Sequence, residues 1–312
     1  TLVTARAHAH VVRDVQARRT ERRPPPPYTT STLQQDASRK LRLSAKQAMD
    51  AAQRLFEAGA ITYHRTDSPR VSDEAALMAR QHIAAHHPEA LPERAPRARA
   101  AAGAQDAHEA IRPTKLSSEE VPAGPAATLY AMIKARFLAS QSKPATFDRT
   151  TVLIDAGPVP WAAEGSVLLD AGFLVFWGPY ARQEDVVLPQ VAAGQTLTPD
   201  DLRVHEKSTQ PPSRYDQGAL IKKLETSGIG RPATFAGIID TLLQRDYVRE
   251  VKGAGRGKGA GKAFLQPTEF GLQVDGLLTS AFPELVTEGY TAEMEARLDE
   301  IERGGVTRPA YL

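Results

Sequence analysis

Residues 59–68 read Gly-Ala-Ile-Thr-Tyr-His-Arg-Thr-Asp-Ser, and they are the most informative segment of the chain. We expect a short β-like piece at 61–63, on which residues two apart share a face, so that Tyr63 and Arg65 can address one phosphate. A phenol, with an ordinary pKa of about 10, attacks phosphate poorly at neutral pH unless cations stabilise both groups. A lone tyrosine would be an ordinary core or surface residue. The neighbouring arginine is what favours a nucleophile here.

The elements on either side of this segment are predicted to be helices. Ser44 begins one of them, with Gln47 placed for a capping box and Gly59 placed to end it in a left-handed conformation. Its apolar positions recur at helical spacing, at Ala45, Ala48, Met49, Ala52, Leu55 and Phe56. A second helix begins at Ser72 and a third lies near 126–140, whereas the prolines at 24–27 require an extended connector.

From about residue 150 the pattern changes to short β-prone runs broken by glycine and proline. These runs are 151–154, 166–169, 173–177 and 202–206. Strands are therefore expected over most of this stretch.

The last third of the chain is predicted to turn helical again. One helix carries Leu220, Ile221 and Leu224 and ends at Gly228, and the next has Pro232 in its first turn. Its apolar positions are Phe235, Ile238, Ile239, Leu242 and Leu243. A hairpin with a basic tip at 253–262 follows. Two helices and such a hairpin outline a winged helix, which often binds DNA.

Composition limits the classes of protein and of site. The chain has 312 residues and no cysteine, which excludes disulfides, thiolate metal sites and cysteine nucleophiles. No apolar run approaches the roughly 18 residues that span a bilayer, so no membrane partner is expected and a cytoplasmic location fits. The net charge is +2, but residues 1–54 hold eleven Lys and Arg against four Asp and Glu. Such a segment either contacts phosphates or is solvated surface.

Two further clusters bear on chemistry. In 108–114, Arg112 stands where a zinc protease needs its second histidine, so that class is excluded. Glu109 and Arg112 could form a surface ion pair, or His108 and Arg112 could face a phosphate. In 228–235, free N–H groups at a helix start would lie beside Arg231 and Thr234, unless the segment is an ordinary turn between helices.

The glycine- and lysine-rich run at 253–262 superficially resembles a P-loop. Arg256 stands where the first glycine of that motif belongs, and Ala263 follows Gly261 and Lys262. No ATP site is therefore expected.

Six segments, taken in order, resemble the type IA DNA topoisomerases, and bacterial topoisomerase I most closely. They are 29–38, 59–68, 107–114, 211–215, 228–235 and 282–296. One short motif could recur by chance, whereas six in the family's order, running nearly end to end, are specific.

The resemblance implies a reaction and its residues. Tyr63 would cut one strand, keep a 5′-phosphotyrosine link and free a 3′-hydroxyl, and resealing would need no ATP. Arg65 and His108 would complete the catalytic set by contacting the scissile phosphate. The residues implied to bind DNA are Arg231, Thr234, Arg245, Arg112, Glu109 and Lys46. The expected activity is relaxation of negatively supercoiled DNA through transient single-strand breaks, in the cytoplasm and on the nucleoid.

The resemblance also implies an α+β, mainly helical, multidomain architecture with a toroidal core, a β-rich arch and winged-helix-like modules. Residues 1–22 and 146–207 would form the arch, 23–145 the catalytic-tyrosine domain and 208–312 part of the strand-binding base. The family's Toprim domain has no counterpart in the sequence, which is expected to be an internal fragment. Mg²⁺ should bind that missing domain, and no metal site is expected in this chain.

Three alternatives remain open at the level of sequence. The chain could be a non-catalytic winged-helix DNA-binding module, or the topoisomerase half of a reverse gyrase, since His64 suits that branch equally. A tyrosine recombinase is a third possibility, but its scattered arginine and histidine partners are not recognisable.

Overall fold

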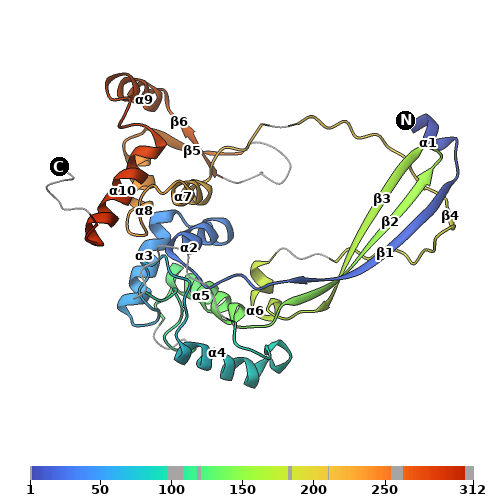
Figure 1. Cartoon of the computed structure of the whole chain (residues 1–312), viewed down its shortest axis with the longest axis horizontal. Helices are drawn as coiled ribbons and strands as arrows, with labels where there is room; N and C mark the ends of the chain where they lie inside the picture. Colours follow the sequence, from blue (N-terminus) through green and yellow to red (C-terminus); the bar gives the residue numbers. More distant parts are fainter. Residues whose placement is uncertain are drawn as a thin grey trace. The chain divides into compact units, whose positions relative to one another are not determined.

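The computed structural model describes residues 2–96, 108–117, 121–181, 185–209, 211–253 and 263–305. They divide into two compact units (Figure 1). The first comprises chain ranges 1–26, 73–96 and 138–211, and the second comprises 27–72, 97–137 and 212–312. The segment 73–96 groups with the first unit, whereas the predicted catalytic-tyrosine domain, 23–145, includes it; the domain boundaries stay a prediction.

The first unit is built on a four-stranded antiparallel sheet with the order β3-β2-β1-β4 (Figure 1). Its strands are β1 (His10–Arg22), β2 (Ala145–Ala156), β3 (Val159–Asp170) and β4 (Thr196–Leu197). The β1–β2 register runs from His10 opposite Ala156 to Arg22 opposite Ala145. Long strands therefore occur where the basic N-terminal segment and the β-prone runs at 151–154 and 166–169 lie.

Two of the predicted strands are wrong. Residues 173–177 form a helical turn, α6 (Leu174–Trp177), because Phe173 and Trp177, four apart, both bury their rings on one side. Residues 202–206 form no strand, since they are largely exposed and have no described strand beside them to supply ladder hydrogen bonds.

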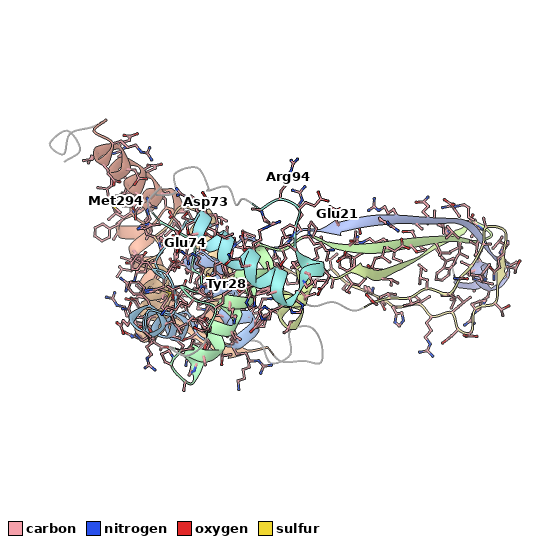
Figure 2. The ribbon with its side chains drawn as sticks, turned by 90° about the horizontal axis from the view of Figure 1, so that it is seen from below. Glu21, Tyr28, Asp73, Glu74, Arg94 and Met294 are labelled. Carbon is pink, nitrogen blue, oxygen red and sulfur yellow. The ribbon has the colours of Figure 1, made fainter. Side chains whose placement is uncertain are left out.

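Short helices complete the first unit. They are α1 (Leu2–Arg6), α4 (Asp73–His86), η2 (Pro88–Ala90) and η3 (Gly178–Tyr180). Asp73 and Glu74 occupy the first turn of α4, where they complement the positive end of the helix dipole (Figure 2). Lys143 joins this part to the sheet, because its Nζ lies 2.6 Å from Asp170 Oδ2 and its N–H donates to the Ala90 carbonyl.

The second unit is mainly helical. Its elements are α2 (Thr30–Asp36), η1 (Ala37–Leu41), α3 (Ala45–Glu57), most of α5 (Pro125–Ser140), α7 (Gln217–Thr226), α8 (Phe235–Gln244), β5 (Val248–Lys252), β6 (Ala263–Pro267), α9 (Glu269–Ala281) and α10 (Glu288–Glu302). A core cluster joins α3, α7 and α8 through Ala45, Ile221, Leu224, Phe235 and Ile239.

The predicted caps of α3 are confirmed. Ser44 Oγ accepts the Gln47 N–H at 3.1 Å, and the Ser44 N–H donates to Gln47 Oε1 at 2.9 Å, which closes the capping box. Gly59 then takes a φ of +71°, the left-handed conformation that ends the helix. The chain leaves α3 at a defined angle directly into the segment that carries Tyr63.

The order α7, α8, β5, β6 reproduces the predicted pair of helices and hairpin. Strands β5 and β6 pair antiparallel from Val248 opposite Pro267 to Lys252 opposite Ala263. Helix α8 begins later than expected, at Phe235, and Pro232 lies in the preceding turn. Residues 254–262 of the basic tip lie outside the described residues, and the winged helix stays a prediction.

Candidate active site and nucleic-acid interface

The segment after α3 is not the strand that we expected, because the backbone bends at Thr62, His64 and Arg65. Ile61 forms only an isolated bridge with Pro113. The side chains nevertheless alternate between solvent and interior, with Tyr63, Arg65 and Asp67 exposed. The buried set is His64, Thr66 and Ser68, each 1% exposed. Tyr63 and Arg65 are thus both accessible without a sheet.

Two neighbours hold this segment in place of a sheet. On one side, Thr30 at the start of α2 donates its N–H to the Thr66 carbonyl at 2.8 Å and its hydroxyl to the His64 carbonyl at 2.8 Å. On the other side, the Thr62 N–H donates to the Arg112 carbonyl at 2.9 Å. The backbone around Tyr63 is therefore fixed from both sides while its ring stays accessible.

Tyr63 lies in a group of aromatic rings. Its ring centroid is 5.4 Å from that of Phe56 and 6.1 Å from that of His108, and 42% of the residue is exposed. No described residue hydrogen-bonds the phenol hydroxyl. The structure brings His108 beside Tyr63 from a segment more than forty positions away, as the resemblance implied.

His64, between the two exposed side chains, is a packing residue. Its ring contacts those of Phe56 and Tyr63, and its Nδ1 has no hydrogen-bond partner among the described residues. Burial, together with the charge of Arg65, holds the pKa of His64 below its ordinary value. His64 is therefore neutral at pH 7, and Arg65 is the cation of this segment.

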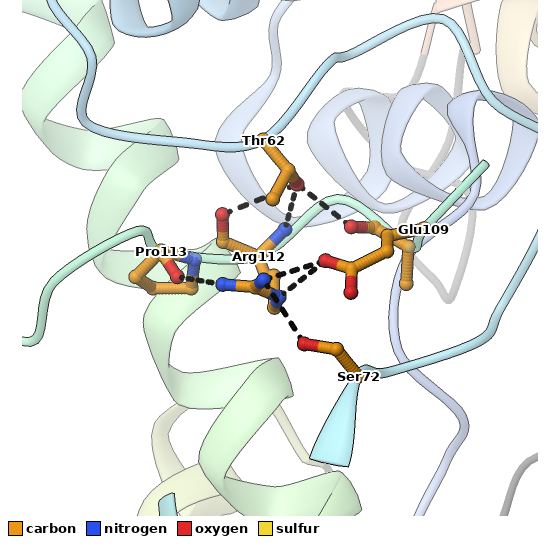
Figure 3. Close-up of polar contacts among 6 residues, drawn as sticks. Thr62, Ser72, Glu109, Arg112 and Pro113 are labelled. Atoms are coloured by element: carbon orange, nitrogen blue, oxygen red, sulfur yellow. Dashed lines mark hydrogen bonds and ion pairs between the residues drawn. The ribbon is translucent and has the colours of Figure 1, made fainter. Parts of the chain in front are cut away.

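The segment 108–114 is locked to the tyrosine segment by a polar network (Figure 3). The guanidinium of Arg112 donates through Nε at 2.9 Å and Nη2 at 2.5 Å to Glu109 Oε2, and through Nη1 at 3.0 Å to the Pro113 carbonyl. Thr62 Oγ1 donates to the Ala110 carbonyl at 2.7 Å and accepts from the Arg112 N–H.

This geometry bears on the two interpretations of Arg112. The side chain is 14% exposed and Glu109 is 28% exposed, so the ion pair is partly buried. The observed contacts are those of the ion pair. A role of Glu109 or Arg112 in binding DNA stays a prediction.

Arg65 shares a small cavity with Lys46. The cavity has a volume of about 150 Å³. It is lined by Lys46, Met49, Asp50, Arg65, Pro232, Ala233, Ala236, Gly237 and Asp240. Arg65 and the residues at the start of α8 therefore line the same cavity.

A second cavity of about 130 Å³ adjoins the first, because Pro232 lines both. Its lining residues are Thr29, Ser31, Thr66, Asp67, Glu225, Gly228, Gly230, Arg231, Pro232 and Phe235. Ser31 Oγ donates to the Glu225 carboxylate there. No signal in the sequence indicated Glu225, and only the alternation of exposure along 63–68 could have indicated that Asp67 is exposed like Tyr63.

Arg231 and Thr234 occupy the tight turn before α8. Gly228 and Gly230 take φ values of +67° and +79°, and Thr234 Oγ1 accepts the Arg231 N–H at 2.9 Å. Arg231 points one nitrogen, Nη2, at Glu295 and Asp299 of α10. Arg245 lies at the opposite end of α8, about 15 Å away along a helix of this length. It is not brought together with the others.

Neither metal ligation nor membrane insertion finds support in the part of the chain that the structure describes. No group of three or more histidine, aspartate or glutamate side chains there could hold a metal ion. The described helices also include none that is long and apolar enough to cross a bilayer.

Comparison with known proteins decides the family. A family model described as DNA topoisomerase matches residues 2–312. The chain belongs to the type IA DNA topoisomerase family. This topoisomerase chain is 38% identical to DNA topoisomerase 1 of Haemophilus influenzae over 95% of its own length and 34% of that protein. For DNA topoisomerase 1 of Streptomyces coelicolor the identity is 40%, over 94% of the chain and 32% of the relative.

A solved structure is similar along almost the whole topoisomerase chain. Full-length topoisomerase I from Thermotoga maritima superposes with a TM-score of 0.82 at 32% identity, covering 96% of this chain and 50% of that one. The mixed α and β architecture predicted for a type IA topoisomerase is thereby confirmed. The chain spans about a third of the length of the curated relatives it matches.

Proposed function

We propose that this chain supplies the nucleophile and part of the strand-binding surface of a type IA topoisomerase. The Tyr63 phenolate oxygen attacks a backbone phosphorus, the bond from phosphorus to the 3′ oxygen breaks, and a 5′-phosphotyrosine link forms. The phenol loses one proton and the departing 3′ oxygen gains one. Reversal restores both, and since the link preserves the phosphodiester's energy, resealing needs no ATP.

The observation that carries this proposal is the arrangement of three side chains. Tyr63 and Arg65 are both exposed, two residues apart, and the His108 ring lies 6.1 Å from the Tyr63 ring. A guanidinium can hold two phosphate oxygens at once and stabilise the charge that develops on them. In this proposal His108, whose ring lies near that of Tyr63, contacts the same phosphate.

The surface around the start of α8 supports the strand-binding part of the proposal. Lys46 and Arg65 line one cavity and Arg231 lines the adjoining one. The free N–H groups in the first turn of α8 favour an anion at the same place. These groups contact phosphates and not base edges, so binding depends steeply on salt and little on sequence.

The remainder of the activity is proposed for the complete enzyme. There, Mg²⁺ and a general acid come from the Toprim domain, the toroid opens to admit a second strand, and negatively supercoiled DNA is relaxed on the nucleoid in the cytoplasm. Helices α7 and α8 with the β5–β6 hairpin act as a winged-helix-like contact in the base domain. Each of these points rests on the family alone.

A binding experiment with the purified chain tests the proposal. With labelled single-stranded DNA and Mg²⁺, we expect binding that weakens linearly in a plot of log affinity against log salt, and no covalent adduct. Tyr63→Phe should bind equally well, because only the nucleophilic oxygen is lost. Failure of the chain to bind single strands at low salt would contradict the proposal. A Tyr63-dependent adduct would show that the Toprim domain is not required.

A further inference from the structure

Helix α10 lies along the turn that carries Arg231, and it does so through one stripe of residues. Lys223 Nζ donates to Glu288 Oε2 at 2.9 Å, and a Cβ on Gly228 would lie 3.2 Å from the Ala292 Cβ. Arg231 Nη2 lies 3.2 Å from Glu295 Oε2 and 3.5 Å from Asp299 Oδ2. Positions 288, 292, 295 and 299 are spaced four, three and four apart, so they form one face of the helix.

The contact with Arg231 is built into the unit. Glu295 is only 24% exposed, and close packing at Ala292 leaves the turn and the helix little room to separate. Both acids approach the same nitrogen, Nη2, while 43% of the Arg231 side chain remains exposed. The two acids hold Nη2, and Nη1 donates to the Gly230 carbonyl at 3.4 Å, so the guanidinium is fixed while its remaining N–H groups can still meet a ligand. An unrestrained arginine loses rotamer entropy when a ligand fixes it, and an arginine that is already held loses less.

From this geometry we infer that Glu295 and Asp299 are positioning residues, which hold Arg231 in the orientation that binds a phosphate of the single strand. The inference rests on the proposed function, since it needs Arg231 to bind DNA. It gives α10, an acidic helix that would be expected to repel DNA, an indirect part in binding it. The acids act through Arg231 and do not touch the strand.

The test compares two charge-removing changes on the same helix. Glu295→Gln with Asp299→Asn removes both contacts, whereas Glu293→Gln removes a negative charge from an exposed position of α10 and leaves the Arg231 contacts intact. Single-strand affinity of the whole chain should fall about threefold to tenfold in the first variant, although negative charge has been removed. It should stay level or rise slightly in the second.

Two readouts separate positioning from a merely structural role. In an Arg231→Ala background, the change at 295 and 299 should no longer affect affinity, because the acids then have nothing to orient. In NMR spectra, the Arg231 guanidinium signals should be resolved in the wild type and in Glu293→Gln, and should average in the double variant.

Each contrary result overturns a different statement. Tighter binding by the double variant would mean that α10 competes with DNA, and an equal loss in the Arg231→Ala background would mean that the acids act elsewhere. Unchanged Arg231 signals in a chain that binds DNA would overturn the inference alone. A wild-type chain that does not bind would overturn the proposed function, and the inference with it.

Discussion

The buried ion pair between Asp36 and Arg136 should dominate the stability of the second unit. Arg136 Nη1 lies 3.1 Å from Asp36 Oδ2, and the Tyr28 hydroxyl donates to the same oxygen at 2.8 Å. The guanidinium also lies 4.6 Å from the centroid of the Tyr28 ring. The side chains of Arg136 and Asp36 are 10% and 17% exposed. Burial lowers the pKa of Arg136, a shift that Tyr28 and Asp36 oppose.

Asp36→Ala leaves the Arg136 charge buried without this carboxylate. Breaking a buried pair costs about 3–5 kcal/mol, and because the Tyr28 ring still faces the cation, we expect about 2–4 kcal/mol here. At about 2–4 °C per kcal/mol for a unit of this size, the melting temperature should fall by about 5–15 °C. Differential scanning calorimetry measures this shift directly.

A matched aspartate provides the control. Asp50 pairs with Lys46 at 3.9 Å, but both side chains are more than half exposed, so Asp50→Ala should change the free energy of unfolding by less than about 0.5 kcal/mol. If Asp36→Ala is no more destabilising than Asp50→Ala, the reasoning from burial is refuted.

Three further predictions concern the site and its support. In the complete enzyme, Arg65→Lys should slow DNA cleavage about tenfold to a thousandfold, because an ammonium cannot grip two phosphate oxygens; wild-type cleavage rates would show Arg65 to be structural. Burial holds the folded pKa of His64 below 6.5, so protons favour the unfolded chain. The free energy of unfolding should therefore be steady above pH 6.5 and decline below it by at most about 1.4 kcal/mol per pH unit, with a smaller slope in His64→Phe. Gly271→Ala should destabilise the protein by about 1–3 kcal/mol, because its Cβ would clash with the Tyr247 backbone, whereas Gly276→Ala, in open space on the same helix, should stabilise it in chemical unfolding.

Local chemistry made part of the fold predictable. Three features depend only on residues close together in the sequence and could be predicted from it. They are the capping box of Ser44 and Gln47, the left-handed conformation of Gly59 and the β5–β6 hairpin. The failures have a common cause. Residues 173–177 and 202–206 have β-prone compositions, but a strand forms only where another strand pairs with it, and tertiary packing decides that.

In the site, too, local features could be predicted from the sequence and contacts between distant segments could not. The spacing of Tyr63 and Arg65 matches the alternation of burial that leaves both exposed, although no strand forms there. His108 beside Tyr63 came from the family resemblance, because the contact spans segments far apart in sequence. The contacts of Arg231 with α10 were missed altogether. The four-residue spacing of Glu295 and Asp299 indicates that both lie on one face of a helix, but it does not indicate which residue they contact.

The central claim is that Tyr63 forms the covalent link to DNA, and mapping the adduct tests it most directly. The chain is joined to the part of a type IA topoisomerase that it lacks relative to its curated relatives, incubated with DNA and Mg²⁺, trapped by denaturation and digested with nuclease and trypsin. Cleavage after Arg54 and Arg65 releases residues 55–65, whose only tyrosine is Tyr63. Mass spectrometry should find the nucleotide remnant on this peptide. The remnant should disappear in Tyr63→Phe and persist in Tyr215→Phe, which removes another exposed phenol of the same unit. An adduct on a different peptide, or one that survives in Tyr63→Phe, would contradict the account.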